Sequence, residues 1–215
     1  MVMSKSLFIF GAGGFAKEIY WLIREINSTA PTYEVKGFID QQAHQDGLTI
    51  GREVLPIVAE HDSELQSGQY CFALGIGNPL VGASVTARFA QFDWPNLIHP
   101  SFLFHRETIK FGLGNVVTAG CVFTVDIQVG SFNIFNLHTT VGHDVKIGSN
   151  NVLNPGVHIS GGVVIGDQNL FGTNCSVLQG LEIENRCVVG ANALVTKNVT
   201  ENSVVVGVPA KPLVK

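Results

Sequence analysis

The pair His143-Asp144 is the part of this sequence best suited to acid–base chemistry. An imidazole titrates near neutral pH and can take a proton from an attacking amine or hydroxyl group. A neighbouring carboxylate orients the ring and raises its basicity. The pair follows a glycine, in the segment Val141-Gly142-His143-Asp144. We predict that His143 is a general base supported by Asp144, and the alternative is a histidine at an exposed corner.

The other histidines have no acid immediately after them within a matching context, and we interpret them as structural or solvated. His138 lies five residues before His143 and is its nearest rival. The remaining five are His44, His61, His99, His105 and His158.

The element that carries His143 is a repeat of six residues. Fifteen positions spaced by six are all apolar, and a period of six is the signature of a parallel β-helix. The residue that follows each of these apolar positions is often small or turn-forming. We expect such residues to allow tight corners between the strands, including positive φ. The apolar positions are Phe111, Val117, Phe123, Val129, Phe135, Val141, Ile147, Leu153, Ile159, Ile165, Phe171, Val177, Ile183, Val189 and Val195.

Three hexads make one triangular coil, so residues eighteen apart lie above one another, and fifteen hexads give about five coils. Gly161 follows His143 by eighteen residues, which predicts that its N–H lies near the imidazole, suited to a developing oxyanion. Thr173 and Ala191 form a second pair with the same spacing, on another face.

The N-terminal part reads as an apolar strand, Ser6 to Phe10, a glycine-rich turn, and an amphipathic helix. The turn Gly11-x-Gly13-x-x-Ala16 fits a relaxed dinucleotide-binding fingerprint and could hold a pyrophosphate at the helix N-terminus. The alternative is a tight turn with a purely structural role. Further elements are expected at Val35 to Ile39, Tyr70 to Leu74 and a helix from about Pro79 to Phe92.

The carboxyl ends of these strands should meet in one crevice that contains Gly13, Asp40 and Gly77. A solvated acid is the alternative for Asp40. The segment is long enough for only one mononucleotide-binding half. The predicted substrate-binding residues here are Gly13, Gly14, Phe15, Asp40, Gln41 and Gly77.

Composition narrows the function classes. A net charge of −4 argues against a nucleic-acid binder. The N-terminus resembles neither a signal peptide nor a membrane-spanning helix, so we expect a cytoplasmic protein without a membrane partner. The cysteines show no metal-ligand spacing, and no metal is expected. Three of them differ by multiples of six and should occupy one buried slot; the four are Cys71, Cys121, Cys175 and Cys187.

The repeat, together with the ending Val204-Val205-Val206-Gly207-Val208-Pro209-Ala210-Lys211, resembles the hexapeptide-repeat acyltransferases. With the glycine-rich unit, the whole chain looks like the sugar-nucleotide acetyltransferases related to bacillosamine N-acetyltransferase and sialic acid O-acetyltransferase. The resemblance implies an α/β Rossmann-like domain over residues 1–97 and an all-β left-handed parallel β-helix over residues 98–215. It also implies a homotrimer that binds acetyl-CoA between neighbouring β-helices and the nucleotide sugar on the N-terminal domain.

The function implied by this resemblance is acetyl-CoA-dependent N-acetylation of the 4-amino group of a nucleotide-linked amino-dideoxy sugar, in bacterial surface-glycan biosynthesis. UDP is favoured, with GDP and dTDP open. By the same resemblance, Gly161, Thr173 and Ala191 contact acetyl-CoA, and Asn136 contacts the substrate unless it forms a ladder with Asn154.

Two departures from the family pattern concern the acetyl group and the substrate. Relatives often carry a second histidine nine residues after the base, where this chain has Val152. Their glycine-rich loop often reads Gly-x-x-Gly-His-Gly, where this chain has Phe15 and Ala16. Because phenylalanine cannot donate a hydrogen bond, the pose of the substrate is expected to differ.

Three other functions are weighed against this one. An O-acetyltransferase of the sialic acid type needs the same base and thioester site. A non-enzymatic nucleotide-sugar module would leave His143-Asp144 unexplained. An NAD-dependent oxidoreductase would explain only the first half of the chain.

Overall fold

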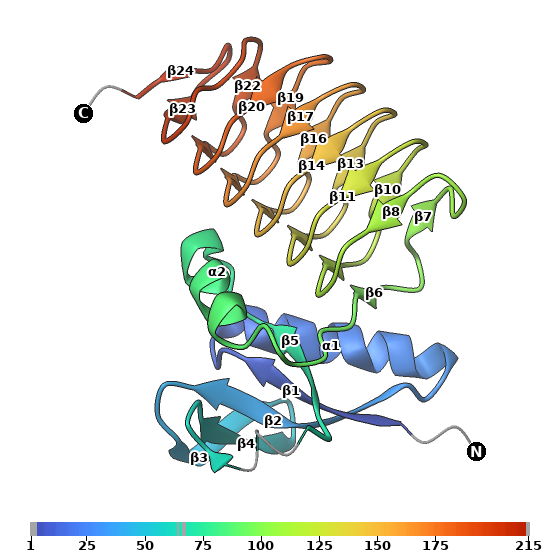
Figure 1. The fold of residues 1–215 in the computed structure, drawn as a ribbon, viewed down its shortest axis with the longest axis vertical. Helices are drawn as coiled ribbons and strands as arrows, with labels where there is room; N and C mark the ends of the chain where they lie inside the picture. The colour runs from blue at the N-terminus through green and yellow to red at the C-terminus, as the bar shows by residue number, and fades with distance from the viewer. Residues whose placement is uncertain (1–3, 64, 66–67, 214–215) are drawn as a thin grey trace.

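The computed structural model, which describes residues 4–63, 65 and 68–213, contains an α/β domain followed by a parallel β-helix (Figure 1). The α/β domain has one five-stranded sheet in the order β3-β4-β2-β1-β5, in which only β3 is antiparallel to its neighbour. The predicted fold class is confirmed. Its elements are β1 (Lys5–Phe10), α1 (Gly14–Thr29), β2 (Tyr33–Asp40), β3 (His44–Ile50), β4 (Glu53–Ala59), β5 (Cys71–Leu74) and α2 (Pro79–Arg88).

Two details of this domain differ from the expectation. Helix α2 ends at Arg88 rather than near Phe92, because Phe89 and Phe92 leave the helix to pack on Phe10 and Phe72 of the sheet. The hairpin β3–β4 was not predicted. Its first strand is mostly exposed and contains Gly47 at φ +65°, so it lacks the apolar alternation that marks a strand.

The β-helix consists of two-residue strands on three flat faces, which we call faces 1, 2 and 3 in chain order. Partners within a face are eighteen residues apart through most of the domain, as predicted. The helix is longer than the sequence repeat: it begins at Leu97, and its last coils shorten to sixteen residues where Ile183 meets Val199 and Val189 meets Val205.

The strands are distributed over the faces as follows. Face 1 holds β6 (Leu97–Ile98), β9 (Val116–Val117), β12 (Ile134–Phe135), β15 (Val152–Leu153), β18 (Leu170–Phe171), β21 (Val188–Val189), β23 (Val204–Val206) and the antiparallel β24 (Lys211–Pro212). Face 2 holds β7 (Leu103–Phe104), β10 (Val122–Phe123), β13 (Thr140–Val141), β16 (His158–Ile159), β19 (Ser176–Val177) and β22 (Leu194–Val195). Face 3 holds β8 (Lys110–Phe111), β11 (Gln128–Val129), β14 (Lys146–Ile147), β17 (Val164–Ile165) and β20 (Glu182–Ile183).

The backbone conformation at the corners of the β-helix differs from what the sequence predicts. Positive φ falls three residues after each apolar position from Phe111 to Val189, as at His138 and Asp144, both at +59°, and not on the glycines that directly follow those positions. Those glycines are needed for a different reason. A Cβ on Gly142 would lie 2.7 Å from the backbone nitrogen of Gly161, and one on Gly172 would lie 2.4 Å from that of Ala191. They let successive coils approach each other.

A ladder of buried asparagines lines the corner between faces 3 and 1. Asn133 donates from its backbone N–H and its side-chain amide to Oδ1 of Asn115, at 2.9 and 3.0 Å, and also to the carbonyl of Gly148 at 2.9 Å. The pattern repeats at Asn151, so these buried amides satisfy one another, but at Asn169 the side-chain nitrogen has no hydrogen-bond partner among the described residues. The ladder starts at Asn96, in the segment that joins the domains, and continues through Asn115, Asn133, Asn151 and Asn169.

The α/β domain packs on face 1 of the β-helix (Figure 1). The outward residues of four face-1 strands, Leu97, Val116, Ile134 and Val152, belong to the same hydrophobic core as the α/β sheet. Trp94 packs edge-to-face on Phe132, and Thr86 of α2 hydrogen-bonds to Asn150 at 3.3 Å. The outward side of face 1 therefore belongs to the core of the α/β domain, while the inward residues of the β-helix form a core of their own.

The four cysteines are all buried and unpaired, as predicted for packing residues. Burial raises the pKa of Cys71 and Cys121 to about 11 and that of Cys175 to about 12. Desolvation penalises a thiolate, so these side chains are neutral apolar groups at neutral pH.

We expect Gly130→Ala to destabilise the β-helix, because the added Cβ would lie 2.5 Å from the carbonyl oxygen of Gly148 on the next coil. Overpacking of this kind costs about 1–3 kcal/mol of unfolding free energy, which urea titration at one protein concentration measures. Gln128→Ala, at an exposed side chain of the same face, is the control and should change stability by less than about 0.5 kcal/mol. Equal midpoints for both variants would contradict this account of the glycines.

Candidate active site

His143 and Asp144 lie on the corner between faces 2 and 3, after β13. His143 Nδ1 is 2.8 Å from Asp144 Oδ2, so the carboxylate holds the proton on Nδ1 and leaves Nε2 free to accept one. The two side chains are about two-thirds exposed, 66% and 67%. Asp144 adopts φ +59°, a conformation that Asp tolerates better than most residues, and this turn brings its carboxylate back to the imidazole.

Gly161 lies directly against the imidazole, as the eighteen-residue spacing predicts. A Cβ on Gly161 would be 2.5 Å from His143 Nε2, so only glycine fits here without displacing the ring. None of the hydrogen bonds between described residues uses the Gly161 N–H. The corner therefore presents a proton acceptor beside an unused backbone donor.

Thr173 and Ala191 lie on the corner between faces 1 and 2, where the N–H of Asn192 donates to the carbonyl of Thr173 at 2.8 Å. No hydrogen bond among the described residues uses the Thr173 or Ala191 N–H either. The corner between faces 3 and 1 differs from Leu113 to Asp167, because side chains satisfy the equivalent amides there: Ser131 accepts from Leu113, and Asp167 accepts from Ser149. The other two corners keep free donors at Gly161, Thr173 and Ala191.

The glycine-rich turn connects β1 to α1. Gly11 has φ +100°, and its N–H donates to the carbonyl of Ile39 at 2.8 Å, which closes the turn onto β2. Helix α1 has Gly13 as its N-cap and no side-chain cap, so its first amides are available. A Cβ on Gly13 or Gly14 would meet nothing within 4 Å. The helix N-terminus is open to an anion.

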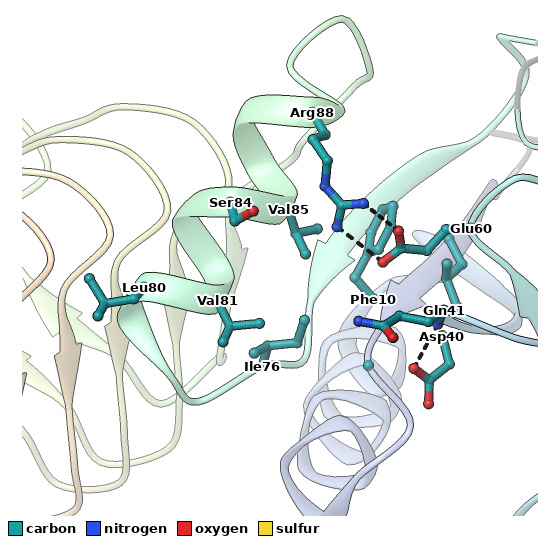
Figure 2. A pocket seen from close by; sticks show the side chains of 12 residues that line it. Phe10, Asp40, Gln41, Glu60, Ile76, Leu80, Val81, Ser84, Val85 and Arg88 are labelled. Atoms are coloured by element: carbon teal, nitrogen blue, oxygen red, sulfur yellow. Dashed lines mark hydrogen bonds and ion pairs between the residues drawn. The ribbon is translucent and has the colours of Figure 1, made fainter.

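One pocket, which we call the sheet-edge pocket, lies beside this turn and has a volume of about 350 Å³ (Figure 2). Asp40 and Gln41 enter it from the end of β2, and Asp40 Oδ1 accepts from the Gln41 N–H at 2.7 Å. Arg88 of α2 and Glu60 form a two-point ion pair at 2.6 and 3.2 Å across it. The other lining residues are Phe10, Gly11, Ile39, Ile76, Leu80, Val81, Ser84 and Val85.

A second pocket, also of about 350 Å³, lies between the two domains, and we call it the interdomain pocket. The α/β domain contributes Phe15 and Glu18 from α1 and Gly77 from the loop after β5. The β-helix contributes apolar and amide side chains from two successive coils at the corner between faces 1 and 2. These are Ile134, Asn136, Leu137, Val152, Asn154 and Pro155.

The single crevice expected from the sequence is therefore wrong in detail. Asp40 and Gln41 line the sheet-edge pocket, whereas Phe15, Gly77 and Asn136 line the interdomain pocket. Gly13 and Gly14 line neither pocket and lie on the turn between Gly11, which borders the first, and Phe15, which borders the second. A ligand longer than either pocket could cross this turn.

Asn136 is not part of an asparagine ladder with Asn154. Its Oδ1 accepts from the Leu137 N–H at 2.8 Å, and no hydrogen bond joins the two side chains in the described part of the chain. The asparagine ladder runs along a different corner. Asn136 is only 8% exposed, and it keeps its side-chain amide donor for the pocket.

The other histidines have local partners or no acid at hydrogen-bond distance. Nδ1 of His99 lies 2.8 Å from the Ser101 hydroxyl, and Nδ1 of His158 lies 2.8 Å from that of Thr140. His44 Nε2 lies 3.9 Å from Asp40 Oδ2. His138 is exposed and stacks against Gly120. Among residues 4–63, 65 and 68–213, no three His, Cys, Asp or Glu side chains are grouped so as to hold a metal ion, and no helix could span a membrane.

Sequence reasoning missed Glu18, Glu60, Arg88 and Asn154. The Glu60–Arg88 pair joins residues 28 apart, between a strand end and a helix that no local pattern relates. Nothing in the sequence distinguishes Glu18 from the other polar residues of the amphipathic helix. Glu18 lines a pocket because face 1 of the β-helix packs beside α1. That packing depends on the outward residues of face 1, whereas the sequence repeat describes the inward residues.

His143 cannot reach the interdomain pocket of its own chain. The pocket opens at the corner between faces 1 and 2, and His143 lies at the next corner, six residues or roughly 20 Å of extended chain away. Both lie at the same height, however. The pocket uses residues of the coil that contains His143 and of the next coil, which contains Gly161.

Known proteins share this fold. Residues 6–89 match the PglD N-terminal domain. The acetyltransferase domain of PglB from Neisseria gonorrhoeae FA1090, in complex with acetyl coenzyme A, aligns with a TM-score of 0.84 and 25% identity over 98% of this chain and 100% of that chain. PerB from Caulobacter crescentus, in complex with CoA and GDP-perosamine, aligns with a TM-score of 0.84 and 25% identity over 99% of this chain and 98% of that chain.

A variant of the Caulobacter perosamine N-acetyltransferase in which one histidine is replaced by asparagine aligns with a TM-score of 0.82 and 26% identity, over 100% of this chain and 99% of that chain. No curated protein sequence matches the chain.

Proposed function

We propose that this acetyl-CoA-dependent acyltransferase, whose residues 6–89 match the PglD N-terminal domain and whose fold is that of the sugar N-acetyltransferases, acetylates the 4-amino group of a UDP-linked amino-dideoxy sugar. The observation that carries the proposal is the arrangement of His143, Asp144 and Gly161. It combines an oriented base with a free backbone donor. Both lie on the coils of the β-helix that also line the interdomain pocket, next to the glycine-rich turn.

The chemistry follows from these groups. Nε2 of His143 takes a proton from the amine as its nitrogen attacks the thioester carbon, and Asp144 stabilises the imidazolium through Nδ1. The Gly161 N–H donates to the thioester oxygen as it gains negative charge. The carbon–sulfur bond then breaks, and the imidazolium returns its proton to the thiolate of CoA. The products are the acetamido sugar and free CoA.

Acetyl-CoA is proposed to lie along a corner of the β-helix. Its pantetheine arm carries amide carbonyls, which need donors, and the N–H groups of Thr173 and Ala191 are free on successive coils of one corner. The corner between faces 3 and 1 satisfies its own amides with side chains and is unsuited to this role. This distribution supports Thr173 and Ala191 as cofactor-binding residues.

The nucleotide is proposed to bind with its base in the sheet-edge pocket and its diphosphate at the N-terminus of α1. Asp40 Oδ1 already accepts from the Gln41 N–H, and both Glu60 oxygens accept from Arg88. Uracil offers one ring N–H flanked by carbonyls, whereas guanine presents two adjacent donors. Because Asp40 and Glu60 already accept hydrogen bonds within the protein, fewer acceptor sites remain, and this favours the base with one donor.

A second subunit is proposed to complete the site. In a ring of identical subunits whose symmetry axis is parallel to the β-helices, equivalent coils lie at equal height. The His143 corner of one subunit would then face the interdomain pocket of its neighbour, which its own chain cannot do. We propose a homotrimer with three such sites.

Replacement of His143 tests the catalytic assignment. We expect His143→Ala to lower kcat/KM for acetyl transfer by about 10²–10⁴-fold, because general-base catalysis contributes that much. Release of free CoA thiol and product mass report the rate. Since the imidazole is exposed, folding and assembly should be unchanged, and His138→Ala is the matched control, which should keep wild-type turnover. Near-normal activity of His143→Ala would overturn the assignment.

Subunit mixing tests the shared site. Gly14→Asp would place a carboxylate at the proposed diphosphate position, in open space where the chain still folds. We expect co-expression of Gly14→Asp with His143→Ala to restore about one quarter of wild-type activity, since random mixing pairs an intact pocket with an intact neighbouring base at that frequency. A mixture as inactive as its two parents would show that the site lies within one subunit.

A panel of UDP-, GDP- and dTDP-linked 4-amino-4,6-dideoxy sugars with acetyl-CoA tests the nucleotide. The UDP-linked sugar should give the highest kcat/KM, because the occupied carboxylates disfavour guanine and because dTDP lacks the ribose 2′-hydroxyl. If none of these sugars is acetylated but UDP still raises the melting temperature of the protein, the chain is a nucleotide-binding module instead. A higher kcat/KM with the GDP-linked sugar would overturn the base assignment alone.

A further inference from the structure

The interdomain pocket has two kinds of wall. Phe15, Leu137, Val152 and Pro155 provide apolar surface, while Glu18 brings the single charged side chain among the described residues that line it. Asn136 offers a free amide donor on the β-helix side. A ligand that fits must combine an apolar group, hydroxyl or carbonyl groups, and a cation.

Glu18 has no hydrogen-bond or ion-pair partner among the residues that the structure describes. Two other acidic side chains differ in this respect: Glu53 is held by Arg24 at 2.7 Å and by Tyr20, and Glu60 is held by Arg88. Glu18 lies on the second turn of α1, so it is too far along the helix to stabilise the helix dipole. Its carboxylate is left available to a ligand.

The order of the pockets along the chain fits a nucleotide sugar. With the base at Asp40 and the diphosphate at Gly13 and Gly14, the sugar would emerge beside Phe15, at the mouth of the interdomain pocket. This pocket spans the two coils that carry His143 and Gly161, so a neighbouring subunit would bring those groups to the same height.

We propose, resting on the function proposed above, that the interdomain pocket is the acceptor-sugar site and that Glu18 selects an amino sugar over a hydroxyl sugar by binding the ammonium group. An aliphatic amine is mostly protonated at neutral pH, so the acceptor arrives as a cation, and it releases one proton to solvent before the neutral amine attacks and His143 takes the second. A carboxylate binds a cation through charge-assisted hydrogen bonds and gives no such gain with a neutral hydroxyl.

The apolar wall accounts for the other end of the sugar. The methyl group of a 6-deoxy sugar has no hydrogen-bonding capacity, so contact with Phe15, Leu137 and Pro155 removes apolar surface from water. A 6-hydroxymethyl sugar would lose hydrogen bonds against the same surface. Glu18 and this wall together favour a sugar with an amine and a methyl group, and Glu18 acts as a specificity residue rather than as the base.

The test compares UDP-4-amino-4,6-dideoxyglucose with UDP-6-deoxyglucose, which carries a hydroxyl at the same carbon. Dissociation constants for both are measured by calorimetry with wild type and with Glu18→Gln, and the same is done for the GDP-linked pair. The wild type should bind the amine more tightly. In Glu18→Gln this preference should fall by about tenfold or more, the size of a lost charge-assisted hydrogen bond.

Two controls isolate the effect. Glu25→Gln changes an acid on the same helix that does not line the pocket and should leave the preference unchanged. Binding of UDP alone should be equal in all variants, because the base and diphosphate contacts are untouched. Turnover should show a raised KM for the amino sugar with an unchanged KM for acetyl-CoA.

The outcomes separate this inference from the function on which it rests. If the wild type acetylates an amino sugar and Glu18→Gln keeps the full preference for the amine, the Glu18 assignment is wrong and the function stands. If Glu18→Gln also loses UDP binding, Glu18 has a structural role and the assignment is wrong again. If the wild type acetylates no sugar of either pair, the proposed function itself fails.

Discussion

Stacking of the coils at a fixed spacing is the constraint on which the rest of the structure depends. Parallel strands of only two residues cannot hold a register alone, so the register comes from the buried asparagine ladder and from the glycines that allow adjacent coils to touch. Because the ladder begins at Asn96, the same register is passed to the segment that joins the domains. The positions of His143 over Gly161 and of Thr173 near Ala191 follow from it.

This constraint is also what made much of the site readable from the sequence. An eighteen-residue period is a local pattern, and it places Gly161 against His143 without any knowledge of the other domain. The reason for the glycines was misjudged, since positive φ falls on Asp144 and its equivalents instead. Periodicity shows which residues are stacked, but the conformation of each corner depends on backbone contacts between coils that the pattern does not encode.

The pockets could not be predicted in the same way, because they depend on contacts between distant segments. Glu60 and Arg88 meet across the end of the sheet only because the unpredicted hairpin β3–β4 ends beside α2. Phe15 and Asn136, more than a hundred residues apart, line one pocket because the outward residues of face 1 are apolar and bury themselves under the α/β domain. The inward repeat carries no information on that packing.

The three corners of the β-helix differ in what they leave unsatisfied, and this difference assigns their tasks. The corner between faces 3 and 1 uses its own side chains for its amides and supports the linker to the α/β domain. The other two keep free N–H groups, one beside the interdomain pocket and one beside the base. The rigid prism holds these two corners apart, so His143 lies away from the pocket of its own chain. The proposed reaction therefore needs a second subunit, because association can join two corners that folding separates.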